Sequence, residues 1–178
     1  VLDLTSTFKE QSIENPFAFL NKAEEIDVPS LYNVQRLLKH AKNDVNIKGV
    51  YMLCANNPNG YGASEELRRA ILDFKTSGKF VIAFGETITQ KGYYLGAAAD
   101  KVYCHPQGGL DWSGYSTGMI YLKGMLDKLE IQPQIFYAGK FKSATEPLRE
   151  TQMTEANRLQ TGIWLGDLYN QFLKAVAD

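Results

Sequence analysis

The sequence predicts an α/β fold in which a mainly parallel sheet is flanked by helices. Apolar runs of strand length alternate along the chain with longer segments whose apolar residues recur at helical spacing. This alternation implies right-handed βαβ units, which place parallel strands side by side with helices packed over them. At 178 residues, 44% of them hydrophobic, the chain is long enough to build the core of a single domain spanning residues 1–178.

In the first half of the chain, the expected strands are residues 1–5, 48–55 and 79–85. Residues 15–27 have no clean period, and we expect a loop with a short helix there. Ser30 is the expected N-cap of a helix that ends at residues 43–44. The apolar residues of this helix are Leu31, Val34, Leu37, Leu38 and Ala41. Another helix is expected from Ser64 to Gly78, because glycine commonly follows a helix C-terminus.

In the second half, the expected elements are a helix over residues 89–99, a strand over 101–104, a helix over 119–129, a strand over 131–137 and a long helix over 154–177. The expected core stripe of the long helix is Leu159, Ile163, Leu165, Leu168, Phe172 and Val176.

Composition and charge favour an ordinary globular protein without a polyanionic partner. The formal net charge is only -1, so nothing in it predicts binding to nucleic acid or to an anionic membrane. No window approaches ~18 consecutive apolar residues, and no signal peptide is visible. The strand-like opening suggests that the chain was trimmed from a longer polypeptide. Cys54 and Cys104 lie in apolar runs, and we expect both to be buried thiols.

Several common kinds of active site are poorly supported by the residues present. A Ser-His-Asp triad needs a histidine beside a serine, and the two histidines, His40 and His105, are expected to be structural or exposed. No Cys-x-x-Cys or His-Glu-x-x-His pattern occurs, so we expect no metal. Phosphate-binding glycine patterns are also missing, and we expect no cofactor.

Two segments are candidates for a functional site. Residues 138–147 carry Lys140 and Lys142 between Gly139 and Pro147, after an apolar run. A lysine held among apolar groups loses solvation, and its pKa falls from about 10.4 towards roughly 7–8, where it can act as a general base. The alternative is that both lysines are solvated, and spacing alone leaves this open. Residues 56–62 follow a strand and precede a helix, where open α/β sheets tend to bind ligands, although an Asn/Pro/Gly turn is the simpler interpretation.

The segment Gly139-Lys140-Phe141-Lys142-Ser143-Ala144-Thr145-Glu146-Pro147 resembles the lysine-bearing segment of the signal peptide peptidase A (protease IV) family, in its long two-domain form. The resemblance covers nearly the whole chain. Further matching segments are Gly92-Tyr93-Tyr94-Leu95, Ala98-Ala99-Asp100-Lys101-Val102, Pro106-Gln107-Gly108, Tyr121-Leu122-Lys123, Leu126-Asp127-Lys128-Leu129 and Met153-Thr154. The chain is similar to the first of the two tandem domains, and the resemblance implies a ClpP/crotonase-like fold built from repeated ββα units.

The resemblance also implies roles for single residues. Lys142 matches the family's general base, whereas Lys140 matches a position that is not catalytic. Asn57 and Gly60 lie where the family's protease domains offer backbone N–H groups to an oxyanion. Gln90 stands where the catalytic second domain has its serine, and an amide cannot serve as that nucleophile. The chain therefore resembles half of a serine-lysine dyad, inactive by itself.

The partners and location that the resemblance implies are those of a membrane-associated bacterial protease. They are a C-terminal protease domain of the same polypeptide, signal peptides as substrates, a homotetramer, and an extracytoplasmic (periplasmic) site with an N-terminal anchor absent from this chain. Two alternatives stay open. One is a non-catalytic scaffold or oligomerisation domain, and the other is a crotonase-like acyl-CoA enzyme, for which Glu86 and Glu146 are the nearest carboxylates.

Overall fold

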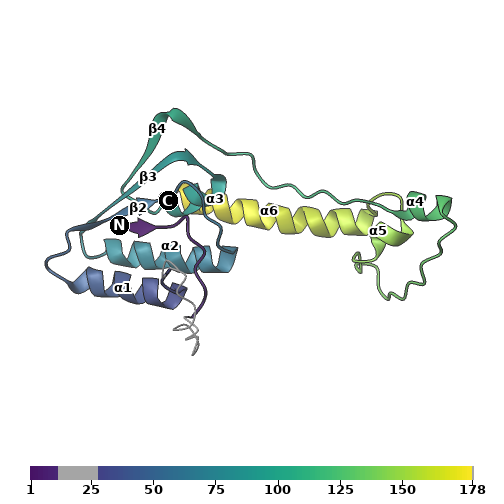
Figure 1. The fold of residues 1–178 in the computed structure, drawn as a ribbon, viewed down its shortest axis with the longest axis horizontal. Helices are drawn as coiled ribbons and strands as arrows, with labels where there is room; N and C mark the ends of the chain where they lie inside the picture. The colour runs from purple at the N-terminus through teal and green to yellow at the C-terminus, as the bar shows by residue number, and fades with distance from the viewer. Residues whose placement is uncertain (12–27, 178) are drawn as a thin grey trace, which may run out of the picture. The chain divides into compact units, whose positions relative to one another are not determined.

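The computed structural model describes residues 1–11 and 28–177 (Figure 1). The chain divides into two compact units. Unit 1 comprises Val1–Ser113 and Ala175–Asp178, and unit 2 comprises Gly114–Lys174. The loop and short helix expected over 15–27 lie outside the described residues. The expectation of one domain over residues 1–178 stays a prediction.

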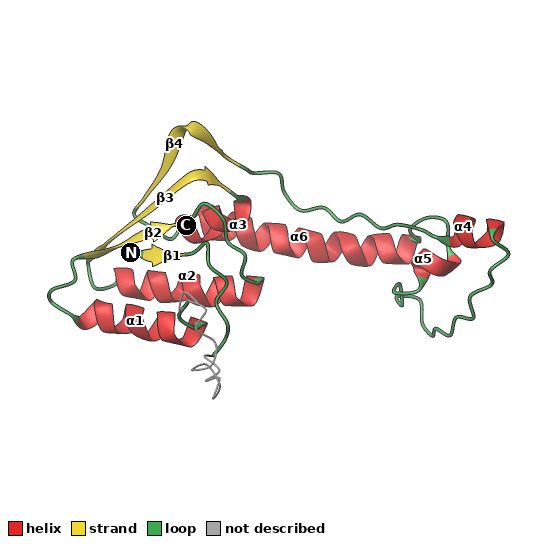
Figure 2. Ribbon diagram, in the orientation of Figure 1, coloured by secondary structure: helices red, strands yellow, loops and turns green. Residues whose placement is uncertain are grey.

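Unit 1 is built on a parallel sheet of four strands in the order β1-β2-β3-β4 (Figure 2). The strands are β1 (Leu2–Asp3), β2 (Gly49–Leu53), β3 (Phe80–Ile88) and β4 (Lys101–Leu110). The predicted α/β class with a parallel sheet flanked by helices is therefore confirmed. β4 is longer than expected because its pairing with β3 resumes after a register shift between Gly85 and Thr87.

Three helices of unit 1 connect successive strands along the chain: α1 (Leu31–Asn43), α2 (Tyr61–Lys75) and α3 (Gln90–Gly96). α2 packs against both α1 and α3. Ser30 caps α1 as predicted, since its side chain accepts a hydrogen bond from the backbone N–H of Asn33 at 3.3 Å. α2 begins at Tyr61 rather than at Ser64, because Gly60 already takes the extended N-cap conformation.

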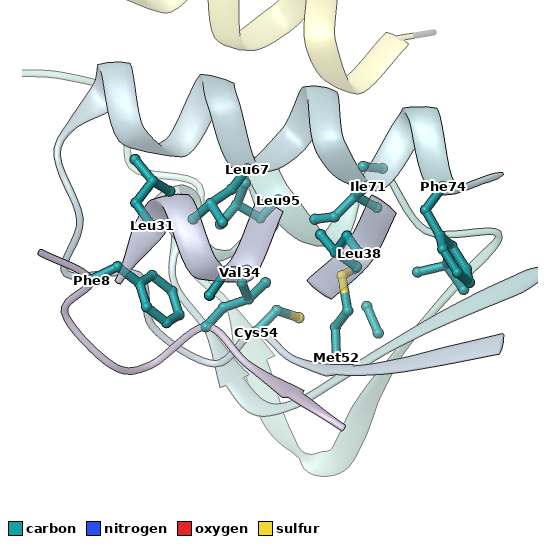
Figure 3. Packing of buried hydrophobic residues seen from close by; sticks show 14 of the residues in the cluster. Phe8, Leu31, Val34, Leu38, Met52, Cys54, Leu67, Ile71, Phe74 and Leu95 are labelled. Carbon is teal, nitrogen blue, oxygen red and sulfur yellow. The ribbon is translucent and has the colours of Figure 1, made fainter. Parts of the chain in front are cut away.

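The hydrophobic core of unit 1 lies between the sheet and these helices (Figure 3). Among its fully buried side chains are Leu67, Ile71 and Phe74 from α2 and Met52 from β2. Cys54 is buried as predicted, but Cys104 is exposed. The prediction for Cys104 was wrong because β4 is the last strand of the sheet and its residues are largely exposed.

Unit 2 contains α4 (Lys123–Lys128), α5 (Glu146–Arg149) and most of α6 (Glu155–Ala177). α6 matches the predicted long helix closely. The strand predicted over residues 131–137 was wrong, since this described segment has no regular secondary structure and Phe136 within it is 84% exposed. A strand needs a neighbour to satisfy its backbone groups, and these residues have no strand beside them in the part of unit 2 that is described.

The predicted core stripe of α6 is only partly buried. Phe172 is 2% exposed, whereas Leu159 and Ile163 are each 57% exposed. The prediction was wrong for Leu159 and Ile163, because helical spacing identifies an apolar face but not what covers it.

Candidate functional site

The loop after β2 is held by a network of buried polar side chains. Asn57 is 2% exposed, and its Oδ1 accepts hydrogen bonds from the backbone and side-chain N–H groups of Asn59, at 3.1 and 3.0 Å. Its Nδ2 donates to Ser64 Oγ at 2.8 Å, and Ser64 in turn donates to the carbonyl of Gly60 at 2.8 Å. Asn57 therefore fixes the loop through its side chain and joins it to the first turn of α2.

Gly60 stands at the exposed start of α2. It is the N-cap residue and has no side chain with which to cap the helix. A Cβ added at Gly60 would meet nothing within 4 Å, so close packing does not require glycine there. The oxyanion role expected of Gly60 belongs to its backbone N–H and stays a prediction.

Gln90 opens α3 at the end of the adjacent strand β3, beside the same loop. Thr89 caps the helix by accepting a hydrogen bond from the N–H of Gly92 at 3.1 Å. Asn57 Nδ2 lies 3.4 Å from the carbonyl oxygen of Lys91, so the loop touches the first turn of α3. The structure thus brings Asn57, Gly60 and Gln90 to one edge of the sheet, and Gln90 is 7% exposed.

Gly92, which belongs to the motif Gly92-Tyr93-Tyr94-Leu95, permits close packing of α3 on the chain after β2. A Cβ at Gly92 would overlap the carbonyl oxygen of Cys54. Glycine is needed here for space rather than for an unusual backbone conformation.

Lys142 lies in unit 2, in a series of turns between the segment predicted as a strand and α5. Its backbone N–H donates to the carbonyl of Gly139 at 3.4 Å. Gly139 has a φ of 96°, in the region that favours glycine, so this residue allows the turn to form. The side chain of Lys142 is exposed, as is that of Lys140.

A buried carboxylate lies four residues beyond Lys142. Glu146 is 1% exposed, and its Oε1 accepts a hydrogen bond from the Thr154 hydroxyl at 2.5 Å. Its Oε2 accepts from Asn157 Nδ2 at 2.8 Å and from the Thr154 backbone N–H at 3.4 Å. Arg149 lies 3.7 Å from Oε1. No sequence pattern predicts this cluster, since the carboxylate stands in a polar, charged stretch.

The Glu146 carboxyl is a fixed acceptor rather than a proton carrier. Burial opposes its ionisation, but the hydrogen bonds from Thr154 and Asn157, together with Arg149, outweigh burial and hold the pKa of Glu146 below its usual value. The other carboxylate considered for acyl-CoA chemistry, Glu86, is exposed on β3. Neither residue therefore has the setting of a buried acid/base pair.

Within residues 1–11 and 28–177, no three or more His, Cys, Asp or Glu residues gather where they could hold a metal ion. The helices in this part of the chain are too short or too polar to cross a membrane.

Comparison with known proteins decides the family. The profile of peptidase family S49 matches residues 73–178, more than half of the chain. The chain belongs to peptidase family S49. The family is ClpP-like in fold, in agreement with the predicted fold class. The predicted resemblance to protease IV is likewise confirmed by the relatives.

Protease 4 of Salmonella typhi is 34% identical to this S49 chain over 159 residues, which are 87% of the chain and 25% of that protein. Protease 4 of Haemophilus influenzae is 34% identical over 154 residues, 84% of the chain and 24% of the relative. The chloroplastic serine protease SPPA of Arabidopsis thaliana is 34% identical over 138 residues, 78% of the chain and 20% of the relative. The S49 chain thus spans about a quarter of the length of these relatives.

Proposed function

We propose that this chain is the lysine-bearing domain of a serine-lysine dyad peptidase and that Lys142 is its general base. The nucleophilic serine would come from a second domain of the same polypeptide. The observation that carries the proposal is Gln90. At the start of α3, where the resemblance to the family's second domain would place the serine, this member of a peptidase family has a buried amide without a nucleophilic oxygen.

The proposed chemistry is acyl transfer. The uncharged amine of Lys142 takes the proton of the serine hydroxyl as the serine oxygen attacks the scissile carbonyl. The resulting ammonium returns the proton to the leaving amine when the C–N bond breaks, and water then hydrolyses the acyl-enzyme. Backbone N–H groups at the oxyanion site stabilise the negative charge on the former carbonyl oxygen.

The exposure of Lys142 sets a condition on this proposal. A lysine in water is protonated at neutral pH and cannot act as a base. Removing water from the amine requires a covering surface, which the second domain would supply. The chain by itself is therefore expected to be inactive.

The substrates and assembly are proposed on the same basis. Extended apolar peptides, signal peptides among them, would be cleaved at the membrane surface on its extracytoplasmic side by a homotetramer. The large apolar side chains left exposed in unit 2 support burial against further protein. The most exposed of these are Ile120, Leu129, Phe136, Leu159, Ile163 and Trp164.

The test is Lys142→Ala in the complete polypeptide, with Lys140→Ala as the matched control. Both lysines are exposed and lie in the same turn. Loss of a general base is expected to lower kcat by about 10²- to 10⁴-fold on a signal-peptide substrate, whereas the control is expected to keep kcat within about twofold. Equal activity of the two variants would refute the general-base role.

One observation favours a second candidate function, a non-catalytic scaffold domain. The Lys142 side chain is exposed and makes no hydrogen bond through its amine among those of the described residues. A scaffold predicts that K142A retains peptidase activity while truncation of the whole domain abolishes assembly. The Lys142→Ala measurement therefore separates the two functions.

A further inference from the structure

Glu146 is a buried ionisable group that the proposed chemistry leaves without a role. Its side chain is 1% exposed, and both carboxylate oxygens are occupied by donors from Thr154 and Asn157. It cannot meet a substrate without breaking these bonds. Whatever Glu146 does for the reaction, it does through its neighbours.

The hydrogen bonds fix Glu146 at the beginning of α6. The Thr154 hydroxyl donates to Glu146 and also accepts from the backbone N–H of Asn157 at 3.3 Å. Asn157 is itself 2% exposed, and its Oδ1 accepts from the Thr161 hydroxyl at 3.1 Å. Hydrogen bonds are directional, so this network sets an orientation that apolar contacts alone would leave loose.

Hydrogen-bonded backbone turns connect Glu146 to Lys142. The N–H of Glu146 donates to the carbonyl of Ser143 at 2.9 Å, closing a turn directly after Lys142. The N–H of Lys142 closes the preceding turn on Gly139. One hydrogen-bonded turn, residues 143–146, therefore separates Lys142 from the buried Glu146, and a second turn, residues 139–142, holds the backbone before it.

A second contact closes the same segment from the other side. The Arg149 guanidinium lies over the Tyr137 ring, 4.1 Å from its centroid, and its Nε donates to the Thr145 hydroxyl at 3.3 Å. The carbonyl of Pro147 accepts from the N–H of Leu122 at 2.7 Å. These contacts hold residues 137–149 as one loop, in which the Glu146 side chain is buried.

We infer that Glu146 is the positioning residue for Lys142, which it holds in the geometry needed to reach the serine hydroxyl. This inference rests on the proposed general-base function. Misplacement of a reacting group by about 1 Å can cost about 100-fold in rate, so a loosened anchor would act on kcat. The buried Glu146 side chain is not expected to contact the peptide, so its loss should change KM little.

The test compares Glu146→Ala with Glu146→Gln in the complete polypeptide. Alanine removes every hydrogen bond that the Glu146 side chain accepts. We expect kcat to fall about 100-fold, with KM within threefold of wild type. Glutamine has the same length, its oxygen accepts from Asn157, and its amide donates to the Thr154 hydroxyl. It is therefore expected to keep kcat within about fivefold. Asp127→Asn, which loses only the exposed pair with Lys123, is the matched control and should leave kcat unchanged.

A double-mutant cycle distinguishes positioning from a general loss of structure. An activated ester substrate, which needs little help from a base, is used to measure K142A with and without E146A. If Glu146 acts only through Lys142, the second substitution changes the residual rate less than about twofold. The inference would be overturned if E146A lowered the rate of K142A as much as it lowers the rate of wild type. It would also be overturned if E146A kept full kcat, or if kcat of E146Q were as low as that of E146A.

Thr154→Val gives a readout should E146A fail to fold. It removes one donor and leaves the bond from Asn157, so kcat is expected to fall about three- to tenfold at unchanged KM. An unchanged kcat would overturn the inference. If the proposed function itself is wrong, K142A will stay active, and this result differs from every outcome expected when only the positioning role is wrong. Inactive K142A together with fully active E146A would reject the positioning role alone.

Discussion

The carboxylate of Asp100 joins helix α2 to strand β3. Its Oδ2 accepts the backbone N–H of Val81 on β3 at 2.7 Å, and its Oδ1 pairs with Lys75 of α2 at 3.0 Å. The hydrogen bond from Val81 outweighs the effect of burial, and Lys75 adds to it, so the pKa of Asp100 lies below its usual value. This contact explains structurally why an aspartate stands just before β4.

Asp100→Ala is expected to lower the free energy of unfolding by about 1 kcal/mol at pH 7, a value reduced by the 43% exposure of the side chain. Because the folded pKa is lowered, the stabilisation is complete above the unfolded pKa of about 4 and is lost as pH falls through the folded pKa. Urea unfolding from pH 7 to pH 2.5 measures the difference from wild type.

Asp73→Ala is the control, since Asp73 makes only an exposed pair with Lys42. Its effect should stay within about 0.5 kcal/mol. A difference between wild type and D100A that grows on acidification would contradict a lowered pKa of Asp100 in the folded state.

The candidate residues differ in how far the sequence could place them. Asn57, Gly60 and Gln90 follow adjacent parallel strands, and such positions share one edge of a sheet, so their proximity was predictable. Burial of Glu146 was not predictable. Its partners Thr154 and Asn157 are 8 and 11 residues away, and no local pattern reveals that three polar side chains leave solvent together.

At the scale of elements, the predictions succeeded where burial and pairing reinforced the local pattern. β2, β3 and the three helices of unit 1 were located because each strand has a parallel neighbour and each helix has a core to cover. Residues 131–137 also carry apolar side chains, among them Ile135, Phe136 and Tyr137, but make no strand. An apolar run indicates only a preference for the strand conformation. Pairing partners distant in sequence decide whether a strand forms.

Gly92 tests the packing of one element on another. Gly92→Ala places a Cβ against the carbonyl oxygens of Cys54 and Ala55, so α3 must move from the chain after β2. We expect a loss of about 1–3 kcal/mol in the free energy of unfolding. The matched control is Gly62→Ala on α2, where a Cβ meets nothing within 4 Å and helix propensity favours alanine by up to about 1 kcal/mol. Thermal unfolding should order the variants G62A, wild type, G92A, and a reversed order would refute the packing role.

At the scale of the whole molecule, the two units differ in how they bury apolar residues. Unit 1 has a contiguous core to which β2, β3 and the three helices contribute buried residues, with Leu2 of β1 and Val102 of β4 packed against it. In unit 2, the buried apolar residues among those described are Ala156 and Phe172, while Ile120 and Phe136 are 79% and 84% exposed. Apolar surface of this extent is typical of a face that contacts other protein.

The proposed homotetramer predicts the outcome of Ile163→Asp on α6. Ile163 is 57% exposed in this chain, so a charge there should not disturb the fold of either unit. Where the side chain is buried between copies, losing about 1.5–3 kcal/mol of apolar burial raises the dissociation constant roughly 10- to 150-fold, and burying the carboxylate raises it further. Sedimentation of the complete polypeptide should therefore show smaller species at micromolar concentration. Gln160→Asp adds the same charge at an exposed polar position of α6 and is expected to leave the assembly intact. If I163D sediments like wild type, Ile163 lies outside the interface between copies, and the apolar face of α6 must be covered in another way.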